Sequence, residues 1–359
     1  MLHRQIENVH IEEERAILSP NTLKDEYPLL EGDVQTVQKG QSAVKAILDR
    51  SDPRLLVIVG PCSIHDPKAA IEYAQRLNSL AAEVADELVL LMRVYYEKPR
   101  TTVGWQGLVN DPHLDQSFDI EAGLRLARKL LLQITRMGLP VATEALDIVT
   151  PPYIQDLISY TAIGARTVES QSHRKMASGL TSAVGFKNAT SGDISVAIHA
   201  IQSAARCHNF ISINPEGHAA IIRTRGNPHG HLILRGGITP NYERPHIRQC
   251  ELQMREAGIP DNLIVDFSHG NSMKDPHRQA EVALDVCTQI ADGVESIRGV
   301  MIESNLLEGN QAIPEDLSTL QYGVSITDAC IGWDRTEAIV HDLHRASQQR
   351  QHRTAKQLH

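Results

Sequence analysis

The sequence predicts an α/β fold, a (β/α)8 TIM barrel with an N-terminal extension and an inserted β-hairpin. Two observations lead to this prediction. Eight short apolar runs rich in β-branched residues follow one another along the chain, and stretches with helical periodicity separate most of them. An alternation of this kind over about 250 residues is typical of a parallel barrel, in which a helix follows each strand.

The expected elements can be placed by residue number. Strands are expected at residues 55–60, 88–93, 140–144, 162–166, 183–187, 231–235, 263–268 and 299–303. Helices are expected at residues 67–86, 120–137, 193–206, 247–257 and 275–290. Two further runs, 209–213 and 219–224, flank Asn214-Pro215-Glu216-Gly217 and predict a hairpin.

Three regions follow from this placement. Residues 1–50 form a polar N-terminal extension with helix-like patches at 12–18 and 34–48, and we expect it to serve regulation or subunit contacts. Residues 51–343 form the catalytic barrel, which includes the hairpin at about 209–224. Residues 344–359 are rich in Gln, His and Arg and predict a polar C-terminal tail, the frayed end of a helix.

The composition excludes several classes of protein. A chain of 359 residues with 42% hydrophobic and 22% charged residues is typical of a globular protein. The sequence has neither an apolar run long enough to span a membrane nor a signal peptide, which predicts a cytoplasmic location. The five cysteines are scattered and form no CxxC pair, so we expect reduced thiols. A net charge of −9 argues against binding to nucleic acid or to an anionic membrane.

Charged or nucleophilic residues stand at or just after the end of almost every expected strand. They are Cys62, Arg93, Glu144, Arg166, Lys187, Arg235, His269 and Glu303. Buried parallel strands are normally apolar throughout, so any one of these residues needs a reason, although a single one is more often structural. Because strand ends of a barrel converge on one face, the joint pattern predicts an active site there.

The cations of this set point to an anionic ligand. Lys98 and Arg100 lie just beyond the second strand and add to Arg93, Arg166, Lys187 and Arg235. Guanidinium groups bind phosphate and carboxylate oxygens at two points, whereas lysine supplies a compact charge. Two phosphates and a carboxylate would balance this density of positive charge.

The remaining residues suggest a metal site. Cys62, His269 and Glu303, together with Asp328 in the loop after the last strand, combine one thiolate, one imidazole and two carboxylates. Such a mixed donor set suits one divalent metal ion, Mn2+, Fe2+, Co2+ or Zn2+, better than magnesium or calcium. The alternative for Cys62 is a small buried apolar residue, and for His269 a structural hydrogen bond.

Long motifs around these residues resemble the class I (alpha type) 3-deoxy-D-arabino-heptulosonate 7-phosphate (DAHP) synthases, nearest to the tryptophan-sensitive isoenzymes. The motifs run from about Leu55 to Trp333. They include Gly60-Pro-Cys-Ser-Ile-His65, Glu97-Lys-Pro-Arg-Thr101, Gly164-Ala-Arg-Thr167, Gly185-Phe-Lys-Asn188, Leu234-Arg-Gly-Gly237, Asp266-Phe-Ser-His269, Glu308-Gly-Asn-Gln311 and Ser325-Ile-Thr-Asp-Ala-Cys330.

This resemblance implies a metal-dependent transferase, a 3-deoxy-7-phosphoheptulonate synthase. It would condense phosphoenolpyruvate with erythrose 4-phosphate in the first step of the shikimate pathway. The metal ligands would be Cys62, His269, Glu303 and Asp328. Phosphoenolpyruvate would meet Arg93, Lys98, Arg166, Lys187 and Arg235, with Glu144 nearby, and erythrose 4-phosphate would meet Pro99, Arg100 and Thr101. Lys98 could pass a proton to the new alkoxide and Glu144 could steer water.

The resemblance also implies feedback inhibition by an aromatic amino acid and assembly into a homodimer or homotetramer. The matching effector positions are Ile148, Pro151, Pro152, Leu180, Thr181, Phe210, Ser212 and Ile222. The hairpin segment 210–217 and the run 226–231 favour tryptophan as the effector.

Two other functions compete with this interpretation. A related barrel condenses phosphoenolpyruvate with a five-carbon sugar phosphate, but the N-terminal extension, the hairpin and the Lys98-Pro-Arg-Thr101 motif argue against it. A non-catalytic sensor would have lost a metal ligand or a phosphate-binding cation, and this sequence retains all of them.

Overall fold

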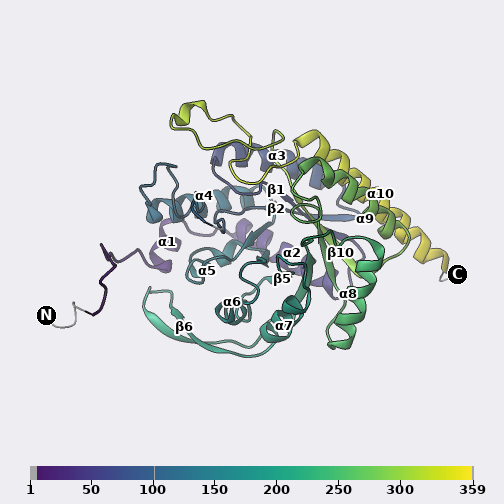
Figure 1. Ribbon diagram of the computed structural model, residues 1–359, viewed down its shortest axis with the longest axis horizontal. Helices are drawn as coiled ribbons and strands as arrows, with labels where there is room; N and C mark the ends of the chain where they lie inside the picture. The colour runs from purple at the N-terminus through teal and green to yellow at the C-terminus, as the bar shows by residue number, and fades with distance from the viewer. Residues whose placement is uncertain (1–5, 101, 358–359) are drawn as a thin grey trace.

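The structure, a computed structural model, describes residues 6–100 and 102–357 and shows a closed barrel ringed by helices (Figure 1). Eight parallel strands close in the order β1-β10-β9-β8-β5-β4-β3-β2. Their bounds are β1 Leu55–Gly60, β2 Leu88–Arg93, β3 Val141–Glu144, β4 Tyr160–Ile163, β5 Ala183–Lys187, β8 Gly230–Leu234, β9 Leu263–Asp266 and β10 Ile297–Glu303. The predicted fold class is confirmed.

Helices follow the strands and cover the outer face of the barrel (Figure 1). They are α3 Pro67–Glu83, α4 Ile120–Arg136, α5 Pro151–Ile154, α6 Gln171–Ala177, α7 Ser195–Ala204, α8 Arg244–Glu256, α9 Gln279–Ala291 and α10 Trp333–Gln357. The described residues also form short 3-10 helices at η2 Gln155–Leu157, η3 Pro276–Arg278 and η4 Leu317–Thr319. Helix α3 shows how the sequence sets such an element: Asp66 accepts hydrogen bonds from the first backbone N–H groups, and Pro67 occupies the first turn.

Apolar side chains fill the barrel interior as well as the layer beneath the helices. The interior cluster contains Leu56, Ile58, Leu91, Ile264 and Met301 from the strands. Strands buried on both faces are expected to be almost wholly apolar, which is why LLVIVG and LVLLMR were recognisable from sequence.

Helix α2 (Glu31–Leu48) closes the amino-terminal end of the barrel. Its side chains Val44, Ile47 and Leu48 belong to the interior cluster, and the helix contacts β1, β2, β4 and β5. This segment, expected to be part of an extension, therefore contributes to the hydrophobic core of the barrel.

A close approach at Gly40 holds α2 against the barrel. A Cβ atom there would lie 2.6 Å from Pro140 Cβ and 2.5 Å from Ser159 Oγ. We expect Gly40→Ala to lower the free energy of unfolding by about 1–3 kcal/mol, the usual cost of overpacking a tight contact. The matched control is Gly32→Ala in the same helix, because its Cβ would meet nothing within 4 Å. Urea unfolding of both variants tests this, and equal effects of the two would contradict it.

The first residues of the chain differ from the prediction. Residues 12–18 form no helix, so that expectation was wrong, and helix α1 instead spans Pro20–Glu26. Ser19 caps α1 by accepting a hydrogen bond from Thr22 N, and Pro20 sits in its first turn. The Ser19-Pro20 pair is a recognisable signal for the start of a helix. The charged residues 12–18 are not preceded by such a capping residue.

The predicted hairpin is present and projects from the barrel (Figure 1). Strands β6 (Asn209–Ile213) and β7 (Ala219–Arg223) pair antiparallel, with Phe210 opposite Ile222. The hairpin turn contacts the N-terminal segment, because Asn21 N donates a hydrogen bond to Pro215 O at 2.9 Å. The two features expected to act in regulation are therefore in contact.

The segment expected as a polar tail continues α10 as an ordered helix to Gln357. Ala346, Ser347 and Arg350 are buried, and Gln351 donates a hydrogen bond to Glu87 at 2.6 Å. Among the described residues, none of the helices combines the length and apolar character that crossing a membrane requires.

Candidate active site

A cavity of about 360 Å³ lies at the carboxyl ends of the barrel strands. Five of the six predicted cations line it: Arg93, Lys98, Arg166, Lys187 and Arg235. Glu144 and Pro99 also line it, whereas Arg100 is exposed and is not among the described lining residues. Thr101 lies outside the residues that the structure describes. The strand-end pattern therefore corresponds to one site.

Two of the cationic side chains that line the cavity form ion pairs with buried carboxylates. Arg93 Nη2 lies 2.7 Å from Glu303 Oε1, and its guanidinium stacks 3.7 Å above the Tyr95 ring centroid. Lys187 Nζ lies 3.0 Å from Asp266 Oδ2. Because all of these charged groups are almost inaccessible to water, their pairing keeps the charges inside the barrel. Burial lowers the pKa of Arg235, which nevertheless stays charged at neutral pH.

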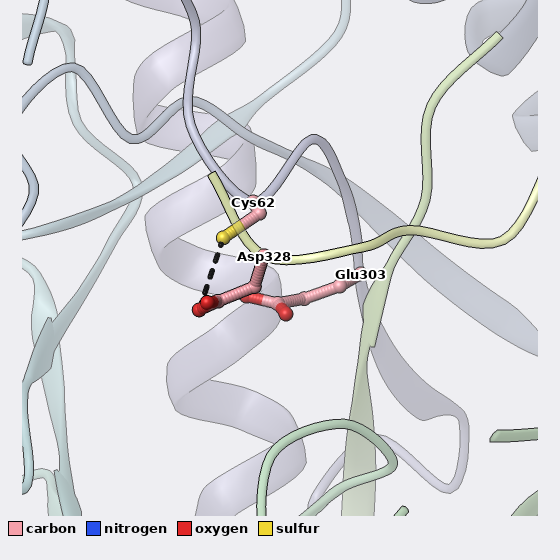
Figure 2. A group of neighbouring side chains, drawn as sticks. All are labelled: Cys62, Glu303 and Asp328. Atoms are coloured by element: carbon pink, nitrogen blue, oxygen red, sulfur yellow. Dashed lines mark hydrogen bonds between the residues drawn. The ribbon is translucent and has the colours of Figure 1, made fainter. Parts of the chain in front are cut away.

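Three of the four predicted metal ligands converge on one point (Figure 2). Donor atoms of Cys62, Glu303 and Asp328 all lie within 4.8 Å of one another. Cys62 follows β1, Glu303 ends β10, and Asp328 comes from the long loop after β10. Cys62 Sγ is 3.6 Å from Asp328 Oδ2, the contact drawn dashed in Figure 2.

The fourth predicted ligand, His269, lies beside this group without being part of it. Its Nε2 is 3.7 Å from Glu303 Oε1, and its Nδ1 is 3.0 Å from Asp266 Oδ2. The backbone of His269 has φ of 59°, a left-handed conformation that non-glycine residues seldom adopt. Such outliers concentrate at functional sites, where the surrounding structure enforces them.

Lys98 brings a positive charge among the metal-binding donors. Its Nζ donates hydrogen bonds to Cys62 Sγ at 2.7 Å and to Asp328 Oδ2 at 3.1 Å. Burial alone would lower the pKa of Lys98, but the negative charges of Glu303 and Asp328 and the hydrogen bond to Cys62 raise it above its ordinary value. The cluster is therefore built to surround a cation.

The thiol and the carboxylates of this cluster differ in protonation. Burial raises the pKa of the Cys62 thiol to about 11. The pKa of Glu303 falls to about 2, because His269, Arg93 and Lys98 outweigh the effect of burial. A buried thiol and two carboxylates, with an imidazole adjacent, fit a divalent transition metal, which would also displace the thiol proton.

Glu144 presents an unpaired carboxylate atom at the cavity wall. Its Oε1 is buried and has no hydrogen-bond partner among the described residues. A Cβ at position 164 would lie 2.2 Å from this atom, so Gly164 leaves the carboxylate room beside the cavity. A buried polar atom without a partner is costly, which indicates that a substrate or water completes it.

Sequence reasoning missed several lining residues. Thr190, Ser268, Ser272, Lys274 and Asn310 also face the cavity. Ser268 Oγ donates a 2.6 Å hydrogen bond to Glu303 Oε2, which orients a metal-binding carboxylate. Ser268 and Asn310 lay within recognisable motifs, but only the spatial arrangement shows what they contact.

The expected effector positions form two groups. Pro151 and Leu180 line a small pocket between α5 and the barrel wall, together with Glu97 and Thr150. Phe210, Ser212 and Ile222 are half-buried on the hairpin, whereas the opposite pair, Ile211 and Ile221, is 76% and 80% exposed. The others, Ile148, Pro152 and Thr181, are exposed or half-buried.

Glu97, beside Lys98, is a buried acid with a raised pKa. Burial and the negative charge of Asp147 raise its pKa to about 7, although Thr150 Oγ1 donates a hydrogen bond to it at 3.1 Å. Since the folded-state pKa exceeds the ordinary value of 4.5, Glu97 contributes stability below about pH 4.5 that is lost as the pH rises to about 7.

We therefore expect Glu97→Gln, which mimics the neutral acid, to raise the free energy of unfolding at pH 8 by about 1–3 kcal/mol. The gain should nearly vanish at pH 4.5. Urea unfolding of both proteins across this pH range measures it, and a pH-independent difference would contradict the assignment. Glu83→Gln, an exposed acid on α3, is the control.

A closed parallel barrel with clustered cations and a Cys-Glu-Asp group at its strand ends defines a metal-dependent barrel enzyme acting on small phosphorylated anions. Comparison with known proteins identifies the family of this enzyme. The model of the DAHP synthetase I family matches residues 34–341, and the chain belongs to this family. It is thus a transferase of the 3-deoxy-7-phosphoheptulonate synthase type.

Individual relatives agree over nearly the whole length. The chain is 55% identical to the Tyr-sensitive phospho-2-dehydro-3-deoxyheptonate aldolase of Escherichia coli K12, covering 94% of this chain and 95% of the relative. It is 49% identical to the Trp-sensitive enzyme of the same strain, covering 91% and 94%. The solved structure of the aldolase from Francisella tularensis SCHU S4 superposes with a TM-score of 0.93 at 48% identity, covering 95% of this chain and 99% of that one.

Proposed function

We propose that this enzyme condenses phosphoenolpyruvate with D-erythrose 4-phosphate to give DAHP and inorganic phosphate. The observation that carries the proposal is a single cavity in which five cations adjoin a cluster of metal-binding donors. Two phosphorylated substrates supply the negative charge that such a cavity requires.

The residues divide between the two substrates and the metal. Arg93, Lys98, Arg166, Lys187 and Arg235, with Glu144 beside them, would bind phosphoenolpyruvate. Pro99, Arg100 and Thr101 would meet erythrose 4-phosphate at the outer side. Cys62, His269, Glu303 and Asp328 would hold one divalent metal, Mn2+, Fe2+, Co2+ or Zn2+.

In the reaction, the methylene carbon of phosphoenolpyruvate forms a bond to the aldehyde carbon, whose oxygen becomes an alkoxide. A bound divalent metal would supply Lewis-acid polarisation of that aldehyde oxygen. Lys98 Nζ stands beside Cys62 and Asp328 and can pass its proton to the alkoxide. Water, which Glu144 orients through its Oε1, then adds to the carbon that carries the phosphate and returns one proton to Lys98. The C–O bond to phosphate breaks as the added hydroxyl group gives its proton to the departing phosphate and becomes the new carbonyl.

A phosphoenolpyruvate-consumption assay tests the activity. Consumption should require erythrose 4-phosphate and cease when a chelator removes divalent metal. Parallel reactions with a five-carbon aldose phosphate provide the comparison. Faster consumption with the five-carbon aldose phosphate would favour the related barrel enzyme that uses such a sugar. If metal-replete protein consumed no phosphoenolpyruvate with either sugar, the result would favour a non-catalytic sensor.

We also propose feedback inhibition by an aromatic amino acid bound between the N-terminal segment (residues 1–50), the hairpin and the loop before α5. The contact of Asn21 with Pro215, and the pocket at Pro151 and Leu180, support this location. The exposed hairpin pair Ile211 and Ile221 supports assembly as a homodimer or homotetramer near the same site.

Tryptophan is the effector that the hairpin sequence favours, although the relative named Tyr-sensitive shares more identity with this chain than the one named Trp-sensitive. Isothermal titration with tryptophan, tyrosine and phenylalanine distinguishes them. We expect heat from tryptophan that Pro151→Leu weakens, while the same variant keeps its affinity for phosphoenolpyruvate. Heat from tyrosine or phenylalanine alone would overturn the choice of tryptophan.

A further inference from the structure

Asp266, the last residue of β9, is a fully buried carboxylate that joins the two halves of the active site. Its Oδ2 lies 3.0 Å from Lys187 Nζ, among the phosphate-binding cations, and 3.0 Å from His269 Nδ1, at the metal site. Its Oδ1 accepts a hydrogen bond from Ser268 N at 3.0 Å. One side chain therefore contacts both a substrate cation and an expected metal ligand.

A neighbouring cation compensates the buried charge of this carboxylate. Asp266 is 0% exposed, and the Lys187 ammonium group lies 3.0 Å from its Oδ2. A buried carboxylate that is not paired would be strongly destabilising, so Asp266 needs its contact with Lys187.

The backbone brings the His269 ring to Asp266. Gly270 N donates a hydrogen bond to Arg235 O at 2.9 Å, and Lys274 N donates one to His269 O at 2.8 Å. Asn271 Nδ2 donates another to Asp266 O at 2.8 Å. These bonds hold His269 in its left-handed conformation, with Nδ1 toward Asp266 and Nε2 on the side of Glu303.

We propose that Asp266 is the positioning residue that fixes the His269 ring, so that Nδ1 carries the proton and Nε2 is the metal-binding atom. The inference rests on the metal site proposed above. In the present conformation the Nδ1–Oδ2 contact is electrostatic, because the ring N–H is not aligned with the oxygen. Rotation of the ring toward alignment would complete a carboxylate-histidine-metal arrangement, in which the outer carboxylate sets the tautomer and raises ligand basicity.

Co2+ binding by the purified full-length protein tests the role of Asp266. Equilibrium dialysis gives the affinity, and the thiolate-to-cobalt absorption band reports the Cys62 contact independently of turnover. We expect Asp266→Asn to weaken Co2+ binding about 10- to 100-fold, the usual effect of losing such an outer partner. The matched control is Asp156→Asn, because Asp156 pairs with buried Arg128 at 2.9 Å away from the cavity. It should bind Co2+ like the wild type even if it unfolds more easily.

His269→Ala and Cys62→Ala separate the inference from the proposed function. If both lose Co2+ while Asp266→Asn binds it as tightly as the wild type, the role of Asp266 is overturned and the metal site stands. If neither loses Co2+, the proposed metal site itself fails.

A crystal structure of the wild-type protein with Mn2+ covers the case in which Asp266→Asn does not fold. We expect His269 Nε2 on the metal and Nδ1 hydrogen-bonded to Asp266. Ligation through Nδ1, or an Asp266 carboxylate turned away from the ring, would overturn the proposal.

Discussion

Cys62→Ala is expected to lower turnover by about 10²- to 10⁴-fold, because Lewis-acid polarisation of a carbonyl contributes several kcal/mol. Cys62 is the sulfur ligand of the proposed site, and its Sγ lies among the Glu303 and Asp328 oxygens. Without it, two carboxylates and one imidazole remain, a set that binds these metals more weakly. Turnover should be measured in metal-replete protein together with Mn2+ affinity.

Cys287→Ala is the control for this variant. Cys287 is also a buried thiol, but it lies on α9, outside the cavity lining. It should keep wild-type turnover and metal affinity. Full turnover of metal-replete Cys62→Ala would show that the metal assignment is wrong.

Lys98→Met is expected to separate catalysis from metal binding. Turnover should fall by about 10²- to 10⁴-fold, the usual contribution of a positioned proton donor. Metal affinity should not fall, and we expect it to rise, because Lys98 Nζ now shares Cys62 Sγ and Asp328 Oδ2 with any incoming cation. The methionine keeps the length of the side chain while removing the charge.

Single-turnover kinetics and Mn2+ titration measure the two effects of Lys98→Met separately. Lys68→Met on α3 is the control, since Lys68 is exposed and lies outside the cavity lining. A loss of Mn2+ affinity parallel to the loss of turnover would mean that Lys98 supports the metal site instead of competing for it.

The barrel strands were largely predictable because burial on both faces requires apolar residues. The exception is β4, expected at residues 162–166 but found at Tyr160–Ile163. The two residues that the prediction left out of the strand, Tyr160 and Thr161, carry hydroxyl groups. In the structure Tyr160 OH pairs with His231 Nε2 at 2.8 Å, and Thr161 Oγ1 pairs with Ser182 Oγ at 2.7 Å. The hydrogen-bond partners of these hydroxyl groups are distant in sequence, so the hydrophobic periodicity of the strand could not predict them.

The active site was predictable where chemistry coincided with a strand end. Arg93, Glu144 and Lys187 were found because a charge there interrupts an apolar strand. Asp266 also interrupts one, yet its significance lies in contacts with Lys187 and His269 that only the folded barrel creates. Short helices such as α5 and α6 were missed because they have too few residues for a periodic pattern.

The position of α2 has a consequence for how the chain folds during synthesis. The helix leaves the ribosome before any of the strands it covers, and its contacts extend to β10, where Arg298 donates a hydrogen bond to Ile47 O at 3.1 Å. Domains that fold during synthesis generally begin at the N-terminus. Here the apolar side chains Val44, Ile47 and Leu48 must wait for more than half of the barrel before they are buried. The nascent chain should therefore be most prone to aggregation while the strands from β1 to β10 are being made.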